Sequence, residues 1–418
     1  MKVKFITLGC KTNFYESQAL AEMFKNSGYT VVKSGKADIC VINTCAVTSM
    51  GAQKSRQQIH RARKENPDAV IAVMGCYSQT DPGALEASPD IDVLIGTSGR
   101  SKIIEFVEEA LNGKKVIAHT DIMKERAFEE LCPTSSQSRI RANVKIEDGC
   151  TNFCSYCIIP YARGPVRSRS LEKIVQEVKL LAKNGFSEIV LTGIHIGSYG
   201  RDLNGELGLI DVMEAVCNID GIKRVRLGSV EPVVITDDFV SRAKKLKNLC
   251  PQFHLSLQSG CDETLKRMKR RYTTEEYMSA VKNLRKNIPD TSITTDVMVG
   301  FPGETDEEFE ESYNFCKAVG FMQMHIFKYS KRPGTVAAEM ENQVPEPIKE
   351  ERSQRLIALE AEMKEAFYDS YKGKTVTVLA EQPTKDGRFH ATTANYMDVF
   401  VKSDTDISGQ FVEYTFED

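Results

Sequence analysis

Short β-branched runs alternate with helical patterns through the first third of the chain. The runs are VKFITL, DICVIN, VIAVMG and DVLIG, and the helical patterns pass through Ala19 and Phe24 and through Ile59 and Ala62. Such alternation predicts a βαβ series and a parallel sheet. We therefore expect an N-terminal parallel α/β domain over residues 1–131.

A second βα series follows a polar stretch, CPTSSQSR at 132–139, which is typical of a linker. Its strand candidates, each followed by helix-compatible sequence, are ANVKI, EIVLTGIHI, RVRLGS, FHLSLQ, SITTDVMVG and MQMHIFKY. Six βα units predict a partial (β/α)6 barrel of the TIM type over residues 140–371. The active site of such a barrel lies at the carboxyl ends of its strands.

The pattern changes again after a charged helix at 346–371. The segments KTVTVLAEQ, RFHATTA, DVFVKS and GQFVEYTFE alternate apolar and polar positions, which predicts antiparallel strands. We expect a small C-terminal antiparallel β module over residues 372–418. A module of this length is short for independent stability.

The composition narrows the compartment and the chemistry. Hydrophobic residues make up 41% of the chain and charged residues 27%, as in a globular protein, and no apolar run is long enough to span a membrane. The N-terminus lacks a signal-peptide pattern, so we expect a cytoplasmic protein. Twelve cysteines in a reducing compartment favour metal or redox chemistry over disulfides. The net charge of -3 does not indicate nucleic-acid binding, for which a local basic patch would suffice.

Three cysteines of the N-terminal domain stand at equivalent places. Cys10, Cys45 and Cys76 each follow one of the first three predicted strands. Parallel sheets bind ligands just beyond the carboxyl ends of their strands, so the three thiols could share one ligand. Each alone would be read as an ordinary buried residue, because free cysteine is often buried.

A second group lies in the loop after the first barrel strand. The stretch DGCTNFCSYC places Cys150, Cys154 and Cys157 within eight residues. Structural zinc takes four ligands, and no second Cys-x2-Cys or Cys/His pair occurs downstream. An iron–sulfur cluster on three thiolates instead leaves one iron open to a small molecule. We favour the iron–sulfur interpretation over zinc.

The CxxxCxxC spacing, with Tyr156 before its last cysteine, resembles the signature of radical S-adenosylmethionine enzymes. In that family the cofactor chelates the open iron, and one-electron reduction cleaves it to a 5′-deoxyadenosyl radical. The resemblance implies cofactor contacts at strand ends such as LTGIHIGSYG, GSVEP and VGFPGE, although each is also a common kind of turn. The expected contacts are Tyr156, Gly193, Ser229, Glu231 and Gly300.

The whole chain resembles the methylthiotransferases, which join an N-terminal cluster domain, a radical barrel and a β module called TRAM. The resemblance rests on TLGCKTNFYES, NTCAVT, GCYSQ, CTNFCSYCIIPYARGPVRSR and FPGETDEEF, in that order. It implies two [4Fe–4S] clusters. One, on Cys150, Cys154 and Cys157, would generate the radical. The other, on Cys10, Cys45 and Cys76, would carry or donate the sulfur.

The reaction implied by the resemblance replaces an unreactive C–H bond by C–S–CH3. A second S-adenosylmethionine supplies the methyl group, and an electron donor of flavodoxin or ferredoxin type feeds the site. Such chemistry belongs to cofactors, while the protein supplies position. A rival class is a non-catalytic iron–sulfur protein that binds RNA.

The substrate is suggested by small features. GCKTN, with Lys11, and YCIIPYARG resemble the MtaB branch, which acts on N6-threonylcarbamoyladenosine at position 37 of tRNA. The alternatives are the branch acting on isopentenyladenosine-37, with a motif closer to GCQMN, and the branch acting on an aspartate of a ribosomal protein. The oligomeric state is not indicated.

Contacts with the tRNA anticodon loop are expected from basic residues. Lys11 is a candidate for the carboxylate of the modified base, and Arg163, Arg167 and Arg169 follow the cysteine loop. The segment LKRMKRRYT concentrates five cations at 266–271, which either neutralise phosphates or form a solvated helix face.

Aromatic residues of the C-terminal module provide a second mode of RNA contact. Phe389, Tyr396 and Phe400 could stack unpaired bases, or could form the core of the module. Reaching C2 of an adenine requires the base to be unstacked, which a loop permits at low cost.

Overall fold

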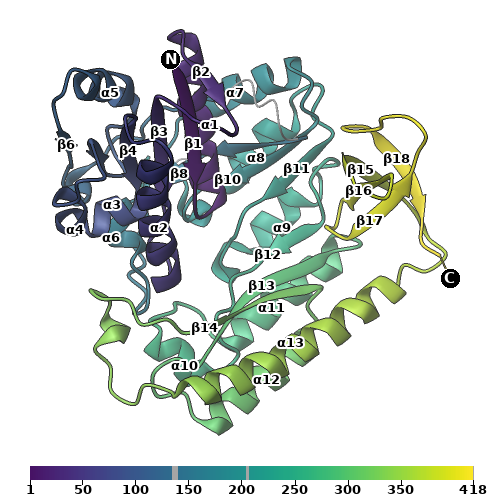
Figure 1. Cartoon of the computed structure of the whole chain (residues 1–418). Coiled ribbons are helices and arrows are strands. Elements are labelled where there is room, and N and C mark those ends of the chain that lie inside the picture. Colours follow the sequence, from purple (N-terminus) through teal and green to yellow (C-terminus); the bar gives the residue numbers. More distant parts are fainter. Residues whose placement is uncertain (134–139, 204–206, 418) are drawn as a thin grey trace.

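Three packed units follow one another along the chain in the computed structural model (Figure 1). The structure describes residues 1–133, 140–203 and 207–417. Most of the predicted linker, 134–139, therefore lies outside the described residues. Within the described ranges, no helix combines the length and apolar character that crossing a membrane requires.

The N-terminal unit is a six-stranded parallel sheet in the order β2-β1-β3-β4-β5-β6. The central strands β3 and β4 are buried along their whole length, because helices cover both faces. The four predicted strands are confirmed, and two three-residue edge strands, β2 and β6, were not predicted. The strands are β1 (Lys2–Thr7), β2 (Thr30–Val32), β3 (Ile39–Thr44), β4 (Val70–Gly75), β5 (Val93–Ile95) and β6 (Val116–Ala118).

Helices sort onto the two faces of this sheet. Helices α1 (Lys11–Asn26) and α5 (Ile103–Leu111) share one hydrophobic core with the sheet. Helices α2 (Ser49–Glu65) and α3 (Cys76–Thr80) share the other. Both α1 and α3 begin at the carboxyl ends of strands, so their first residues lie along one edge of the sheet.

The central unit contains all six predicted barrel strands, each parallel to its neighbours. They form two three-stranded stretches, β7-β10-β11 and β12-β13-β14, joined by a bridge between Val230 and Leu255. The prediction of a partial barrel is confirmed. The strands are β7 (Arg141–Lys145), β10 (Glu188–Thr192), β11 (Arg224–Leu227), β12 (Gln252–His254), β13 (Ser292–Val299) and β14 (Gln323–Lys328).

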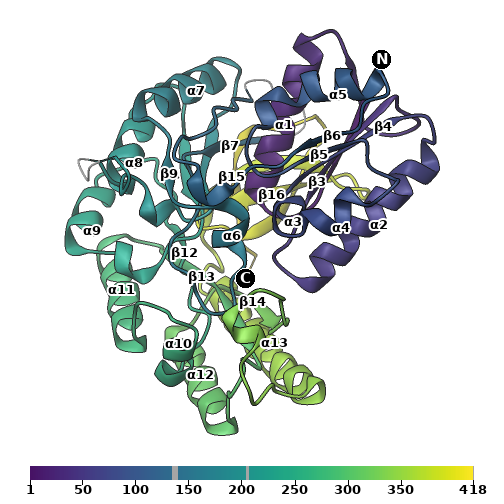
Figure 2. The same ribbon diagram turned by 90° about the vertical axis from the view of Figure 1, so that its left-hand side faces the viewer.

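Alternate residues of the barrel strands face opposite sides. One set, including Val144, Ile189 and Val297, belongs to the main hydrophobic core together with the outer helices. Figure 2 shows these helices along the outside, and they include α7 (Leu171–Lys183), α8 (Leu209–Cys217), α9 (Asp237–Ala243), α11 (Thr274–Asn287) and α12 (Asp306–Val319). The other set faces inward and is mostly polar: Arg141, Asn143, Lys145, Glu188, Arg226, Gln252, His254, Thr294, Asp296 and His325.

The long helix α13 (Glu346–Asp369) packs along β14 and leads into the C-terminal unit (Figure 1). This unit is an antiparallel sheet in the order β17-β16-β15-β18, as predicted. It docks on the barrel through Arg224, which donates to the carbonyls of Thr392 and Thr377 at 2.9 and 2.7 Å. Its strands are β15 (Thr375–Pro383), β16 (Arg388–Thr393), β17 (Asp398–Lys402) and β18 (Phe411–Thr415).

Candidate active site between two cysteine triads

Cys10, Cys45 and Cys76, the sheet triad, stand at one edge of the N-terminal sheet. They follow β1, β3 and β4, which are neighbours in the sheet. Burial raises the pKa of the Cys76 thiol to about 11, and repulsion from Cys10 and Cys45 adds to the effect. The three sulfur atoms are therefore close enough to act on one another.

Cys150, Cys154 and Cys157, the barrel triad, lie in a loop held by two short paired strands, β8 (Glu147–Asp148) and β9 (Arg167–Ser168). Burial raises the pKa of the Cys157 thiol to about 12, with repulsion from Cys154 and Cys150. The loop begins at Gly149, whose φ is +88°. A Cβ there would lie 2.0 Å from the Pro165 carbonyl oxygen, so the close turn needs glycine.

The spacing of the sulfur atoms decides what each triad can hold. Among the described residues, the group of three or more His, Cys, Asp or Glu whose ligand atoms all lie within 4.8 Å contains no cysteine. A single tetrahedral zinc, with Zn–S bonds of about 2.3 Å, would bring its sulfur ligands to roughly 3.8 Å. In neither triad do all three sulfur atoms lie within 4.8 Å of one another, so neither is gathered around a single ion, and an iron–sulfur cluster remains the prediction for both.

Each triad has a buried arginine beside one of its sulfur atoms. Arg163 Nε lies 3.2 Å from Cys76 Sγ, and Arg270 Nη1 lies 3.3 Å from Cys154 Sγ. A guanidinium at this distance stabilises the thiolate form and donates to the sulfur of a ligated cysteine.

Glu231, an expected cofactor contact, is bound by three side chains that the sequence did not single out for this place. Arg270 Nη2, His195 Nε2 and Asn152 Nδ2 lie 2.6, 3.0 and 3.1 Å from its carboxylate. Burial opposes ionisation, but the hydrogen bond from His195 and the charge of Arg270 hold the pKa of Glu231 at about 2. This carboxylate therefore positions protein groups around the barrel triad.

The remaining expected cofactor contacts differ in their surroundings. Ser229 is exposed, whereas Tyr156 packs edge-on against Phe301 with ring centroids 6.5 Å apart. Gly193 accepts a hydrogen bond from Thr12 of α1 at 3.3 Å, which joins the N-terminal unit to the end of β10. Gly300, with φ of +70°, lies against Lys349, whose Cγ would be 2.3 Å from an added Cβ.

The three arginines that follow the cysteine loop are buried, which corrects the expectation that they contact RNA. Arg163 has no exposed surface, Arg167 has 3% and Arg169 has 1%. Arg163 binds Glu16, and Arg169 binds Glu177. Because their guanidinium groups already bind protein carboxylates in the interior, we do not propose them as phosphate contacts.

Glu16 of α1 is the centre of an ion-pair network between the first two units. This fully buried carboxylate binds Arg100 at 2.6 Å, Lys145 at 2.9 Å and Arg163. The favourable charges of these cations hold the pKa of Glu16 well below its usual range, although burial opposes this. Asp148 pairs with Lys145 at 2.6 Å and so extends the network to the cysteine loop.

The five cations of the basic segment at 266–271 have two kinds of environment in the structure. Arg267 pairs with Glu308, and Arg270 points inward to Glu231. Lys266, Lys269 and Arg271 remain exposed and are the members that could meet a phosphate.

A cavity of about 340 Å³ lies where the three units meet. It is lined by Lys11, the inward-facing Arg141 and Arg226, and Tyr396 of the C-terminal unit, among others. The Tyr396 ring stacks with both guanidinium groups, at 4.7 Å from Arg226 and 5.8 Å from Arg141. Phe389, in contrast, belongs to the core of the C-terminal sheet, which is the second of the two roles considered for it.

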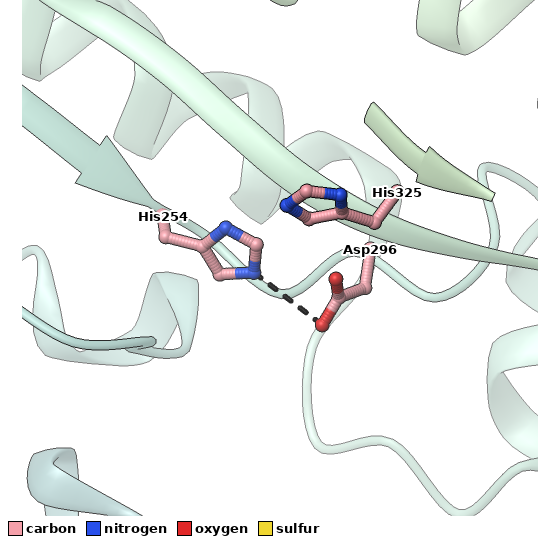
Figure 3. Close-up of side chains that lie close together, drawn as sticks. All are labelled: His254, Asp296 and His325. Atoms are coloured by element: carbon pink, nitrogen blue, oxygen red, sulfur yellow. Dashed lines mark ion pairs between the residues drawn. The ribbon is translucent and has the colours of Figure 1, made fainter. Parts of the chain in front are cut away.

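On the inner face of the opposite barrel wall, His254, Asp296 and His325 converge from three adjacent strands (Figure 3). His254 Nε2 lies 3.4 Å from Asp296 Oδ2. No local spacing in the sequence signals this group, because its members are more than 25 residues apart and meet only through strand register.

Comparison with known proteins gives the family. The Radical SAM superfamily matches residues 144–316, and a family described as uncharacterized, UPF0004, matches residues 2–96. A threonylcarbamoyladenosine tRNA methylthiotransferase MtaB of Bacillus subtilis is 42% identical over 417 residues, 98% of this chain and 92% of the relative. The chain belongs to the radical S-adenosylmethionine methylthiotransferases.

A second relative of these methylthiotransferases carries a different substrate in its name. A tRNA-2-methylthio-N(6)-dimethylallyladenosine synthase of Clostridium novyi is 36% identical over 388 residues, 91% of this chain and 85% of the relative. The family works with S-adenosylmethionine and two [4Fe–4S] clusters, and the number, spacing and arginine partners of the two triads fit two such clusters.

The fold of this methylthiotransferase also occurs among solved structures. The radical S-adenosylmethionine methyltransferase TsrM from Kitasatospora setae, with tryptophan substrate and a SAM analog bound, matches with a TM-score of 0.60 at 14% identity. The match covers 81% of this chain and 75% of that chain. It supports the pairing of an α/β sheet domain with a radical barrel, and the C-terminal antiparallel sheet is consistent with a TRAM module.

Proposed function

We propose that this protein methylthiolates C2 of N6-threonylcarbamoyladenosine at position 37 of tRNA. The observation that carries the proposal is the placement of two cysteine triads, one on each of two units joined by α1, in a chain 42% identical to an MtaB methylthiotransferase. Isopentenyladenosine-37 and a ribosomal-protein aspartate are the alternative substrates. The name of the Clostridium novyi relative supports considering the first of them.

We assign one [4Fe–4S] cluster to each triad. Cys150, Cys154 and Cys157 would hold the first, with S-adenosylmethionine on its open iron near Tyr156, Gly193, Ser229 and Gly300. Cys10, Cys45 and Cys76 would hold the second. When bound, these groups supply hydrogen abstraction, the sulfur and the methyl group.

The chain's own residues position these groups and exclude water. Arg270 and Arg163 donate to sulfur atoms of the two triads, and Glu231 holds Arg270 in place. Thr12 and Glu16 fix α1, which begins directly after Cys10, against the barrel that carries the other triad. The hydrogen-bonded, buried surroundings are what a preorganised site requires.

The cavity beside Cys10 supports a substrate that carries an anion. Lys11, Arg141 and Arg226 line it, and Glu381, which pairs with Arg141, offsets part of their positive charge. A carboxylate on the base would find a cationic partner there that the isopentenyl group does not need. Phe400, 44% exposed on β17, is available to stack an unpaired base of the loop.

Electrons would come from a flavodoxin- or ferredoxin-type donor, in the cytoplasm, where thiols stay reduced. The exposed Phe153 and Tyr161, whose rings meet edge to face at 5.7 Å beside the barrel triad, offer an apolar surface for such a donor.

The test is mass spectrometry of tRNA nucleosides after anaerobic incubation of the reconstituted protein with S-adenosylmethionine, a reductant and tRNA that contains threonylcarbamoyladenosine. We expect the 2-methylthio derivative and 5′-deoxyadenosine. tRNA containing isopentenyladenosine is assayed in parallel, and modification of that tRNA alone would refute the substrate assignment.

Cysteine variants separate the two triads. Cys154→Ser should abolish both products, whereas Cys45→Ser should keep 5′-deoxyadenosine and lose the methylthio product, with about half the iron. Cys132→Ser, an exposed cysteine outside both triads, is the matched control. A Cys45→Ser protein that still methylthiolates would refute the assignment of the sheet triad.

A further inference from the structure

The group formed by His254, Asp296 and His325 stands apart from both cysteine triads. His254 is the last residue of β12, and Asp296 and His325 lie within β13 and β14, whereas the cysteines of the triads follow strands, in loops or at a helix start. Asp296 and His325 are paired in strand register, and His254 is the partner of Thr294, two residues before Asp296. All three side chains therefore project from the same, inner face of the barrel wall (Figure 3).

The orientation of His254 exposes one nitrogen to the other two residues. Its Nδ1 is hydrogen-bonded to Thr294 Oγ1 at 3.0 Å, and Gln252 Nε2 donates to the same hydroxyl at 3.1 Å. The ring is thus fixed with Nε2 directed at Asp296 Oδ2, 3.4 Å away. A histidine held through one nitrogen while the other faces a carboxylate and a second imidazole is the usual arrangement at a metal ion.

The separations suit one ion. Bonds of about 2.1 Å to nitrogen and oxygen place neighbouring ligands of a tetrahedral ion roughly 3.4 Å apart. The pair formed by His254 and Asp296 already has this separation, and all the ligand atoms of the group lie within 4.8 Å of one another. The exposed His325 ring supplies the third ligand atom within this distance.

We propose that His254, Asp296 and His325 bind a divalent transition-metal ion on the inner wall of the barrel. Two imidazoles and one carboxylate suit Zn²⁺, Mn²⁺ or Fe²⁺ better than Mg²⁺ or Ca²⁺, which prefer oxygen ligands alone. The site is additional to the two clusters and does not depend on the proposed function.

The neighbouring charges and the exposed edge of the sheet are compatible with an ion at this place. Lys11 of α1 and Glu360 of α13 also act electrostatically on His325, with opposite signs, so their effects offset each other. Three protein ligands leave at least one coordination position open, and the exposed edge at β14 gives access to it. An ion here would present that position to the inner side of the barrel.

The test is a titration of the cluster-reconstituted, oxidised protein with Mn²⁺, followed by the electron paramagnetic resonance signal of free Mn²⁺. Manganese is chosen because thiolates bind it weakly, so occupied or partly empty triads do not compete. We expect one bound Mn²⁺ per chain.

Asp296→Asn and His325→Gln should each weaken Mn²⁺ binding at least tenfold, while His60→Gln, an exposed histidine paired with Asp90 on the N-terminal unit, should not change it. Iron content and circular dichroism check that the variants fold. If Asp296→Asn fails to fold, His325→Gln still tests the proposal, because His325 is exposed. A titration that leaves free Mn²⁺ unchanged, or equal binding by the variants, overturns the proposal.

Discussion

At the scale of single residues, the site depends on buried cations beside sulfur. Arg270 contacts Cys154 Sγ, Glu231 and Tyr272, so one guanidinium connects the barrel triad to a carboxylate that would otherwise be buried without a counter-ion. Losing one partner of a buried ion pair is costly because the remaining charge stays in the interior.

We predict that Arg270→Gln slows formation of 5′-deoxyadenosine about 10- to 100-fold, since hydrogen bonds to charged groups contribute roughly 1.5–3 kcal/mol. The measurement is the initial rate of 5′-deoxyadenosine release at saturating S-adenosylmethionine. Arg271→Gln, which changes an exposed neighbour with one long contact to the Thr151 carbonyl, serves as the control. A wild-type rate for Arg270→Gln would show that this contact does not matter.

Residue identity alone gave part of this site. Cys150, Cys154 and Cys157 could be found because their spacing is local and their chemistry is specific. The roles of Arg163 and Arg270 could not, because an arginine next to a motif looks equally suited to an RNA phosphate or to a buried carboxylate. Their partners, Glu16 and Glu231, are far away in sequence, so only the fold reveals the pairing.

At the scale of elements, α1 holds the two main units together. Its second residue, Thr12, bonds to the end of β10, and Glu16, one turn later, receives three cations from the rest of the chain. The helix therefore links the edge that carries Cys10 to the barrel strands.

We predict that Glu16→Gln destabilises the protein by about 3–5 kcal/mol, because three cations would surround a neutral amide in the interior. Denaturant unfolding followed by circular dichroism measures the loss. The exposed Glu65, which pairs with Arg61 at the surface, provides the control: Glu65→Gln should change the midpoint little. Equal midpoints for the two variants would contradict the role of the network.

The strands were predictable to different degrees. Long buried runs such as those of β3, β4 and β13 give a clear pattern, since both of their faces or one whole face must be apolar. The edge strands β2 and β6 have three residues each and are partly exposed, so their sequences resemble loops. They pair because a neighbouring strand is already in place.

At the scale of the whole molecule, the C-terminal unit completes the central cavity. Tyr396 and Glu381 line the cavity together with residues of β7 and β11. Arg224 and Ser292 of the barrel donate hydrogen bonds to backbone carbonyls of the C-terminal unit. The sequence predicted the small β module and its strands, but neither its docking onto the barrel nor the cavity that it closes could be foreseen, because both depend on contacts between distant residues.

We predict that Arg224→Ala raises the KM for tRNA about tenfold, because two hydrogen bonds that orient the C-terminal unit are lost. Cleavage of S-adenosylmethionine without tRNA should stay unchanged. Arg224 is at the amino end of β11, whereas the barrel triad lies in a loop beyond the carboxyl end of β7. Steady-state methylthiolation gives the KM. Arg61→Ala, which removes an exposed ion pair on the N-terminal unit, is the control, and an unchanged KM for Arg224→Ala would contradict the prediction.

The network around Glu16 has a consequence for how this enzyme selects its substrate. Arg163 binds both Glu16 and Cys76, and Lys145 binds both Glu16 and Asp148. The N-terminal unit and the barrel are therefore joined by several buried contacts next to the two triads. We expect these ion pairs to keep the separation of the two triads constant when the substrate binds. A nucleoside would then have to leave its own stack to enter, and the side chains that line the reaction space would discriminate between modified bases.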